Sequence, residues 1–318
     1  MKITHLAGFT IPALLLFKHQ AKSDLNVELY PASANDIDNT IYHQVAFEEV
    51  LGLIDDSTDI LHLHGFSTLS FLNTSNQDYS SELVSKAKKQ KVKLVFSAYG
   101  EENRIKSNEL NKFLENTFDH IFVSVPDSIY LLNEIKKTSW VNPGLSSEIL
   151  EASEKRDIND RPLRLIQILR ESYKDESSTL TKQLKDLIAE EKIQLSELKI
   201  DNQTNLGSIM QAFRTADVFI DNLIRPYSYF SMLAMGAGAV ALGYNPTEIS
   251  QKTPVLSLSQ IVNTDENTVK DKLISLIKQP KSVSDLSERS FNFANFNLRI
   301  EISAAEIKKT YQELLKSQ

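Results

Sequence analysis

Short apolar runs alternate with longer segments of helical period along the 318-residue sequence, and this alternation constrains the fold more than any other feature. Helices are expected between the runs, for example over His43–Ile54 and Glu109–Asn116. Strands that alternate with helices predict an α/β fold with a parallel, doubly wound sheet. In the first half the expected strands are Lys2–Ala7, Asn26–Tyr30, Asp59–His64, Lys93–Ser97 and His120–Ser124.

The same alternation begins again after a polar segment. Residues 146–161 are rich in charges and have no apolar period, which is typical of a linker. New strands are expected at Leu163–Leu169 and Leu195–Ile200. The sequence therefore predicts two Rossmann-like βαβ domains facing each other across a cleft, over residues 1–145 and 162–298, and a final amphipathic helix within 299–318.

Composition excludes several classes of function. The net charge is −7, which argues against a general nucleic-acid binder. The sequence has no cysteine, so it holds no disulfide framework, thiolate zinc site or Cys nucleophile. It also lacks the glycine motifs of dinucleotide and P-loop nucleotide sites. The apolar run Ile11–Phe17 is too short to span a bilayer and no leader pattern precedes it, so we expect a cytoplasmic protein.

The segment Ala216–Tyr244 reads as a buried strand, a loop, a short helix and a second buried strand. In an open α/β sheet, ligands lie beyond the carboxyl ends of the strands, beside helix N-termini that suit phosphate. The loop Asn222–Ser228 occupies that place, and Tyr227, Ser228 and Tyr229 lead into the helix. The alternative is an ordinary βαβ turn with a glycine C-cap.

Two histidines end one of the expected strands. His62 and His64 are separated by one residue, so strand alternation places them on the same side. They could ligate a metal, but no third ligand has convincing spacing, and we expect no metal site. The remaining alternatives are two satisfied buried histidines, or a His64 side chain that reaches the ligand cleft.

Charged residues follow other expected strands. The loop Gly100–Arg104 comes after the strand Lys93–Ser97 and is either a solvated charged loop or a carrier of Arg104 into the cleft. Arg170 and Lys174 come directly after the strand Leu163–Leu169. Asn202 follows the strand Leu195–Ile200 and is a further candidate for ligand binding.

Several of these motifs resemble the GT-B glycosyltransferases of the retaining polysaccharide-assembly type, similar to glycosyltransferase family 4. The run Leu233-Ala234-Met235-Gly236-Ala237-Gly238 resembles the family's Glu-Ala-Met-Ala-x-Gly helix. The family's acidic pair, Glu-x7-Glu, falls on Arg225 and Leu233, so both carboxylates are missing. The loop with Arg104 and the His-x-His-Gly end of the earlier strand resemble acceptor-side loops of the same enzymes.

The resemblance implies a GT-B fold, whose last helix packs back toward the first domain. It implies a co-substrate rather than a cofactor: a nucleotide-diphosphate sugar, most simply a UDP-sugar. Arg170 and Lys174 would clamp the diphosphate, with Asn202, Tyr227, Ser228 and Tyr229 as further donor contacts. His64 and Arg104 would lie on the acceptor side, and Arg225 would supply positive charge to the leaving diphosphate.

The resemblance therefore implies a glycosyltransferase whose acceptor is a glycan, a lipid-linked glycan or a glycoprotein. Because the two glutamates are missing, the alternative is a catalytically silent GT-B subunit that binds a glycan, a protein substrate or an active partner glycosyltransferase, or that forms a homo-oligomer. No nucleic-acid partner is expected. A lysine cluster could attract anionic lipids at the inner face of the membrane, although a solvated helix face is the simpler interpretation. The cluster consists of Lys86, Lys88, Lys89, Lys91 and Lys93.

Overall fold

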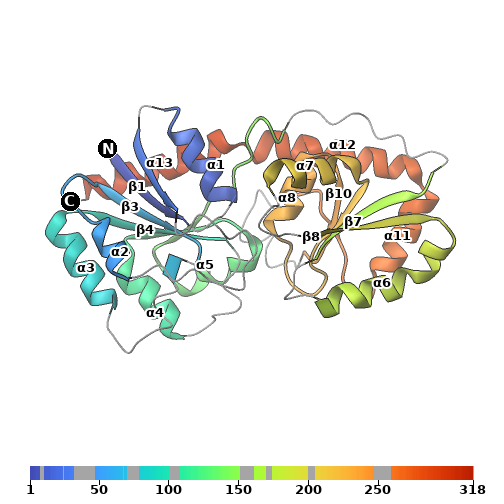
Figure 1. Ribbon diagram of the computed structural model, residues 1–318, viewed down its shortest axis with the longest axis horizontal. Coiled ribbons are helices and arrows are strands. Elements are labelled where there is room, and N and C mark those ends of the chain that lie inside the picture. The colour runs from blue at the N-terminus through green and yellow to red at the C-terminus, as the bar shows by residue number, and fades with distance from the viewer. Residues whose placement is uncertain are drawn as a thin grey trace. The chain divides into compact units, whose positions relative to one another are not determined.

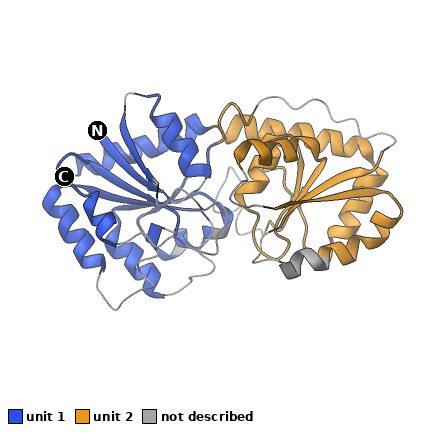
Figure 2. Ribbon diagram, viewed as in Figure 1, with its two compact units in different colours: residues 1–144, 300–318 blue, residues 145–299 orange. Residues whose placement is uncertain are grey.

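The structure is a computed structural model. In it the chain forms two compact units. Unit 1 comprises residues 1–144 and 300–318, and unit 2 comprises residues 145–299 (Figure 2). The structure describes residues 1–7, 11–23, 25–31, 47–66, 68–69, 79–99, 108–150, 161–169, 174–199, 205–245 and 259–317.

Unit 1 is built on a six-stranded parallel sheet of order β2-β1-β3-β4-β5-β6 (Figure 1). Its strands are β1 (Lys2–Ala7), β2 (Asn26–Pro31), β3 (Ile60–His64), β4 (Lys93–Ala98), β5 (His120–Val123) and β6 (Thr138–Trp140). Its helices are α1 (Ile11–Gln20), α2 (Phe47–Gly52), α3 (Tyr79–Gln90), α4 (Asn108–Thr117), α5 (Leu131–Glu134) and α13 (Ile300–Lys316). The parallel α/β arrangement predicted from the alternation of apolar runs is confirmed.

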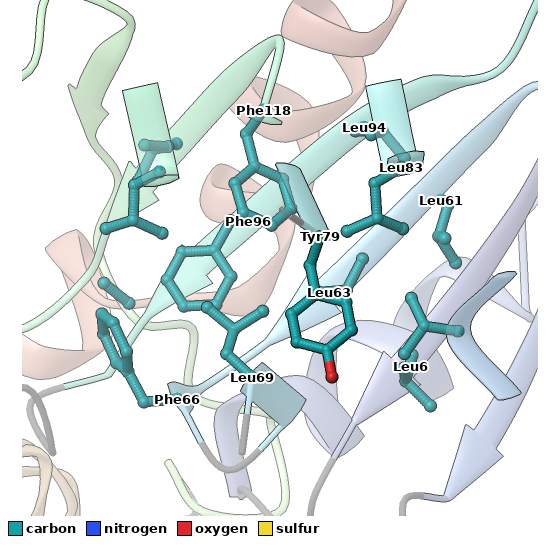
Figure 3. Packing of buried hydrophobic residues seen from close by; sticks show 14 of the residues in the cluster. Leu6, Leu61, Leu63, Phe66, Leu69, Tyr79, Leu83, Leu94, Phe96 and Phe118 are labelled. Carbon is teal, nitrogen blue, oxygen red and sulfur yellow. The ribbon is translucent and has the colours of Figure 1, made fainter. Parts of the chain in front are cut away.

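The two faces of this sheet differ in chemistry because side chains alternate along each strand. One face carries Leu61 and Leu63 of β3 with Phe96 of β4, which pack with Leu83 and Phe118 into a buried apolar cluster (Figure 3). The opposite face carries a histidine from each of β1 and β5 and two from β3. These four residues are His5, His62, His64 and His120.

The C-terminal helix α13 belongs to unit 1 and lies beside α1 (Figure 1). Its buried residues include Ser303, whose hydroxyl donates to the Asn142 carbonyl at 2.6 Å, and Tyr311, which is fully buried. At the start of the helix the backbone of Gly144 packs directly on Ile300. A Cβ atom added to Gly144 would lie 2.6 Å from the Ile300 Cα atom, so this position has no room for a side chain.

Unit 2 is built on a five-stranded parallel sheet of order β11-β10-β9-β7-β8. Its strands are β7 (Leu163–Leu169), β8 (Ile193–Lys199), β9 (Val218–Ile220), β10 (Val240–Gly243) and β11 (Val262–Asn263). Its helices are α6 (Lys174–Ala189), α7 (Leu206–Thr215), α8 (Tyr229–Gly236), α11 (Val269–Lys278) and α12 (Pro280–Asn297).

A buried carboxylate fixes the start of β7 in this sheet. Asp217 is completely buried and accepts two hydrogen bonds from the Arg161 guanidinium, at 2.6 and 2.9 Å. It also accepts the Arg164 backbone N–H at 2.8 Å. Burial by itself raises the pKa of Asp217, but the hydrogen bonds from Arg161 and Arg164 outweigh burial and hold the pKa below its usual value. The ion pair therefore joins the residues that lead into β7 and β9.

Candidate functional site

The loop between β9 and α8 lies where the sequence predicts a phosphate-facing turn, and the carboxylate of Asp221 contacts the start of α8. Asp221 Oδ2 accepts the Ser228 backbone N–H at 2.6 Å and the Ser231 hydroxyl at 2.7 Å. The Ser228 hydroxyl also contacts both Asp221 oxygens, at 3.0 and 2.9 Å. The start of α8 is therefore already neutralised by a negative charge of the chain itself.

Ser228 is the N-cap of α8. Its backbone is extended and its hydroxyl oxygen accepts the Phe230 N–H at 3.2 Å, as capping serines do. The other end of the helix turns through Gly238, whose φ of 75° favours glycine. Small residues there allow close packing, since a Cβ atom on Gly236 would lie 3.0 Å from the Leu145 side chain.

The predicted donor contacts of this loop have different exposures. The side chain of Tyr227 is fully buried, and burial, together with the Asp221 charge, raises the pKa of its hydroxyl. Tyr229 is also buried as the first residue of α8, whereas Ser228 is half-buried. Arg225 is half-buried in the loop itself. Of these four residues, only Arg225 and Ser228 are half-buried rather than buried.

The other predicted charged contacts are described in part or not at all. Lys174 is the first residue of α6, with its side chain outside the described part of the structure. Arg170, Asn202 and Arg104 all lie outside the described residues. In the lysine cluster, Lys93 pairs with Asp119 at 3.5 Å and Lys86 donates to the Leu51 carbonyl, so two of its five cations bind neighbouring groups of unit 1.

In unit 1, His62 and His64 lie on the same side of β3, as predicted, with ring centroids 3.9 Å apart. They belong to a group that also contains the buried residues His5, Gln20, Ser97 and Tyr311 and the half-buried Tyr99, which we call the histidine network. His5 contacts His64 at 2.8 Å and Gln20 at 2.9 Å, and His64 contacts the Tyr99 hydroxyl at 3.0 Å. His62 contacts the Tyr311 hydroxyl at 2.5 Å and the Ser97 hydroxyl at 2.7 Å.

When the rings are neutral, the Gln20 carbonyl oxygen sets the direction of these hydrogen bonds, because it can only accept. His5 therefore donates through Nε2, and its Nδ1 accepts from His64 Nε2. His64 Nδ1 in turn accepts from the Tyr99 hydroxyl. This pattern requires neutral rings. Burial keeps the rings neutral, because it lowers the pKa of His5 to about 4 and the pKa values of His62 and His64 well below their ordinary value.

Three clustered histidines also suggest a metal, because one nitrogen from each of His5, His62 and His64 lies within 4.8 Å of the others. The geometry does not fit a metal site. Two nitrogens bound to one tetrahedral zinc are about 3.3 Å apart, whereas His5 Nδ1 and His64 Nε2 are 2.8 Å apart and share a proton. Both ring nitrogens of His62 are also occupied by the hydroxyls of Tyr311 and Ser97, so His62 has no free nitrogen for a metal. We assign the group as a hydrogen-bonded network.

The arrangement agrees with the alternative of satisfied buried histidines. Both ring nitrogens of His64 are used within unit 1 and its side chain is fully buried, so it presents no surface to a sugar. The hydrogen-bond partners of these histidines could not be predicted from the sequence. His5 lies on the neighbouring strand in register with His62, and Tyr311 is 249 residues from His62. The only available signal was a histidine within the apolar run of β1.

No family model matches the sequence, and no curated protein matches it. Solved structures do match, over nearly the whole length of both chains. The catalytic domain of starch synthase IV from Arabidopsis thaliana, bound to ADP and acarbose, has a TM-score of 0.66 at 11% identity, covering 99% of each chain. HepE from Anabaena, in complex with UDP and glucose, has a TM-score of 0.64 at 10% identity, covering 98% of this chain and 100% of HepE.

The chain has the GT-B fold. A glycosyltransferase from Rickettsia africae gives the same result, with a TM-score of 0.63 at 10% identity, covering 100% of this chain and 99% of the other. The loop from Asp221 to Ser228 follows β9, an inner strand of the sheet in unit 2. His64 is the last residue of β3, an inner strand of the sheet in unit 1. Within the part of the chain that the structure describes, no helix combines the length and apolarity needed to cross a bilayer.

Proposed function

We propose that the protein is a glycosyltransferase that moves a sugar from a nucleotide-diphosphate donor, most simply a UDP-sugar, to a glycan, lipid-linked or protein-bound acceptor. The observation that supports this proposal most strongly is the GT-B likeness, which extends over both units and includes HepE from Anabaena in complex with UDP-glucose. In the proposal, unit 2 binds the donor and unit 1 binds the acceptor.

The chemistry requires the bond between the anomeric carbon and the diphosphate oxygen to break. Negative charge then builds on the leaving diphosphate, and cations stabilise it. In the proposal Arg225 provides this charge from the loop after β9, and Arg170 and Lys174 provide it from the connection after β7. Arg104 binds the acceptor. His64 takes part only through its hydrogen bond to Tyr99, since its ring is buried.

A second candidate function is a catalytically silent subunit that binds a glycan, a protein substrate or an active partner glycosyltransferase. The Asp221 carboxylate at the start of α8 favours it, because an anion seated there would meet a like charge. The residues at the family's two glutamate positions, Arg225 and Leu233, favour it as well, and Leu233 is fully buried.

Turnover separates the two candidates. The purified chain is incubated with a panel of UDP-, ADP- and GDP-sugars, and release of the nucleoside diphosphate is followed with and without mixed glycan acceptors. An active transferase releases diphosphate from at least one donor, and Arg225→Ala lowers that rate. Arg289→Ala, an exposed arginine on α12, serves as the matched control. Release of diphosphate from any donor would rule out the silent subunit. No release from any donor, with or without nucleotide binding, would refute the transferase and favour the silent subunit.

A further inference from the structure

The histidine network joins the sheet of unit 1 to two helices that are distant in sequence. His5, His62 and His64 come from β1 and β3, whereas Gln20 ends α1 and Tyr311 lies on α13. The contact between His62 and Tyr311 spans 249 residues. It is therefore a direct attachment of the C-terminal helix to the centre of the sheet.

Tyr311, which makes this contact, is one of the five buried residues of α13. The buried residues of the helix are Ile300, Ser303, Ala304, Ile307 and Tyr311. Only two of them are large aliphatic residues, and Tyr311 is the bulkiest. The apolar cluster of Leu61, Leu63 and Phe96 lies on the other face of the sheet and includes no described residue of α13.

We propose that the histidine network is an acid-sensitive latch, which keeps α13 docked on unit 1 while its three histidines are neutral and releases the helix when they are protonated. This inference concerns unit 1 alone and does not depend on the proposed transferase activity.

The physical reason is the absence of a compensating charge. Among the described residues, no carboxylate forms a hydrogen bond or ion pair with the rings of His5, His62 or His64. The other titratable groups on this side of the sheet are Tyr99, Tyr311 and His120, and Glu313 of α13 acts on His120. A proton on any of the three rings would therefore be an unpaired buried charge.

The direction of the pH effect follows from the burial. A released, hydrated histidine titrates at its ordinary pKa of about 6.5, whereas docked His5 titrates near 4 and the other two below the ordinary value. Between these values protons bind the released form only. The docked form of α13 is therefore favoured above pH 6.5. As the pH falls below 6.5, the equilibrium constant for release of the helix increases by up to about tenfold per pH unit for each histidine that becomes exposed.

Hydrogen exchange of the full-length protein tests the latch. Exchange is measured between pH 7.5 and 5.5 and corrected for the intrinsic pH dependence. We expect protection of residues 300–317 to fall at least tenfold more than protection of residues 269–297 in unit 2. His62→Asn keeps an acceptor for the Tyr311 hydroxyl but does not titrate, so it should reduce this difference. His19→Asn removes a histidine of α1 outside the network and should leave the difference unchanged.

Two results would overturn the proposal: an equal loss of protection in both units, or a folded His62→Asn protein that keeps the full pH dependence. If His62→Asn does not fold, Tyr311→Phe replaces it, because this change removes one hydroxyl and keeps all three histidines. Its residues 300–317 should lose protection about tenfold at pH 7.5. Unchanged protection in Tyr311→Phe would equally overturn the latch.

Discussion

The Asp221 carboxylate accepts the Ser228 backbone N–H at 2.6 Å, so the chain's own negative charge sits at the start of α8. This contact gives unit 2 a feature that works against a phosphate ligand. A helix N-terminus attracts anions through its free N–H groups and its dipole, and an internal carboxylate satisfies the same groups. Asp221 and an incoming diphosphate would therefore compete for one position.

Asp221→Asn removes this competing charge and keeps the shape of the side chain. We expect the variant to bind UDP about tenfold more tightly than the wild type, which is a modest fraction of the repulsion between like charges at short range. Isothermal titration calorimetry at low salt measures the change. Asp285→Asn on α12 is the matched control, since Asp285 is an exposed acid of the same unit. Equal UDP affinities for wild type and Asp221→Asn would show that Asp221 does not compete with the nucleotide.

Asp217→Asn should destabilise unit 2 strongly, because it leaves Arg161 and Arg164 without their buried partner. Because both arginines are partly exposed to water, the cost is that of losing hydrogen bonds to a charged group, about 1.5–3 kcal/mol. The folded pKa of Asp217 lies below its ordinary value of 3.8, so the carboxylate stabilises the fold above that pH and loses its effect as pH falls through the folded pKa. The difference in unfolding free energy between wild type and variant should therefore have its full size at pH 7 and become smaller below pH 3.8.

Urea denaturation at pH 7 and at pH 3 measures that difference. Asp186→Asn breaks the exposed pair between Asp186 and Lys270 in the same unit, and its unfolding free energy should stay within about 0.5 kcal/mol of the wild type. A small effect of Asp217→Asn at pH 7 would show that the ion pair does not hold the start of β7.

Gly144→Ala should also destabilise the protein, by about 1–3 kcal/mol, because the new methyl group would overlap the Ile300 backbone. The midpoint of thermal or urea unfolding, followed through the fluorescence of Trp140 in unit 1, reports the change. Gly52→Ala is the control, since nothing lies within 4 Å of a Cβ atom placed there. If the two alanine variants were equally stable, Gly144 would not require the close approach of Ile300.

Much of the fold could be predicted from local patterns. Strands such as β4 and β10 are short, mostly buried runs between helices, and the alternation of such runs with helices predicted the parallel arrangement. Helix α12 was not predicted, and its burial pattern explains why. Two of its buried positions are Ser287 and Ser290, so the apolar stripe is interrupted. Ser287 is buried because its hydroxyl donates to the Gly238 carbonyl at 2.5 Å, a contact that spacing in the sequence cannot show.

The candidate sites were less predictable, because their partners are set by tertiary structure. Alternation placed His62 and His64 together, but their contacts with His5 and Tyr311 depend on strand order and on the docking of α13. The pattern also placed Asp221 at the end of a strand. It did not indicate that Asp221 would bond to Ser228 and Ser231, seven and ten residues later. Short-range periodicity thus located the sites, and long-range contacts determined their chemistry.

The proposed function depends most on whether unit 2 binds a nucleoside diphosphate. The direct measurement is the affinity of the full-length protein for UDP and UDP-glucose, by calorimetry, together with the change in melting temperature. We predict that both ligands bind and raise the melting temperature, and that Arg225→Ala weakens binding about tenfold, as expected for the loss of one charged hydrogen bond. Arg289→Ala should bind as the wild type does. No binding of any nucleoside diphosphate or nucleotide sugar at millimolar concentration would contradict the proposal.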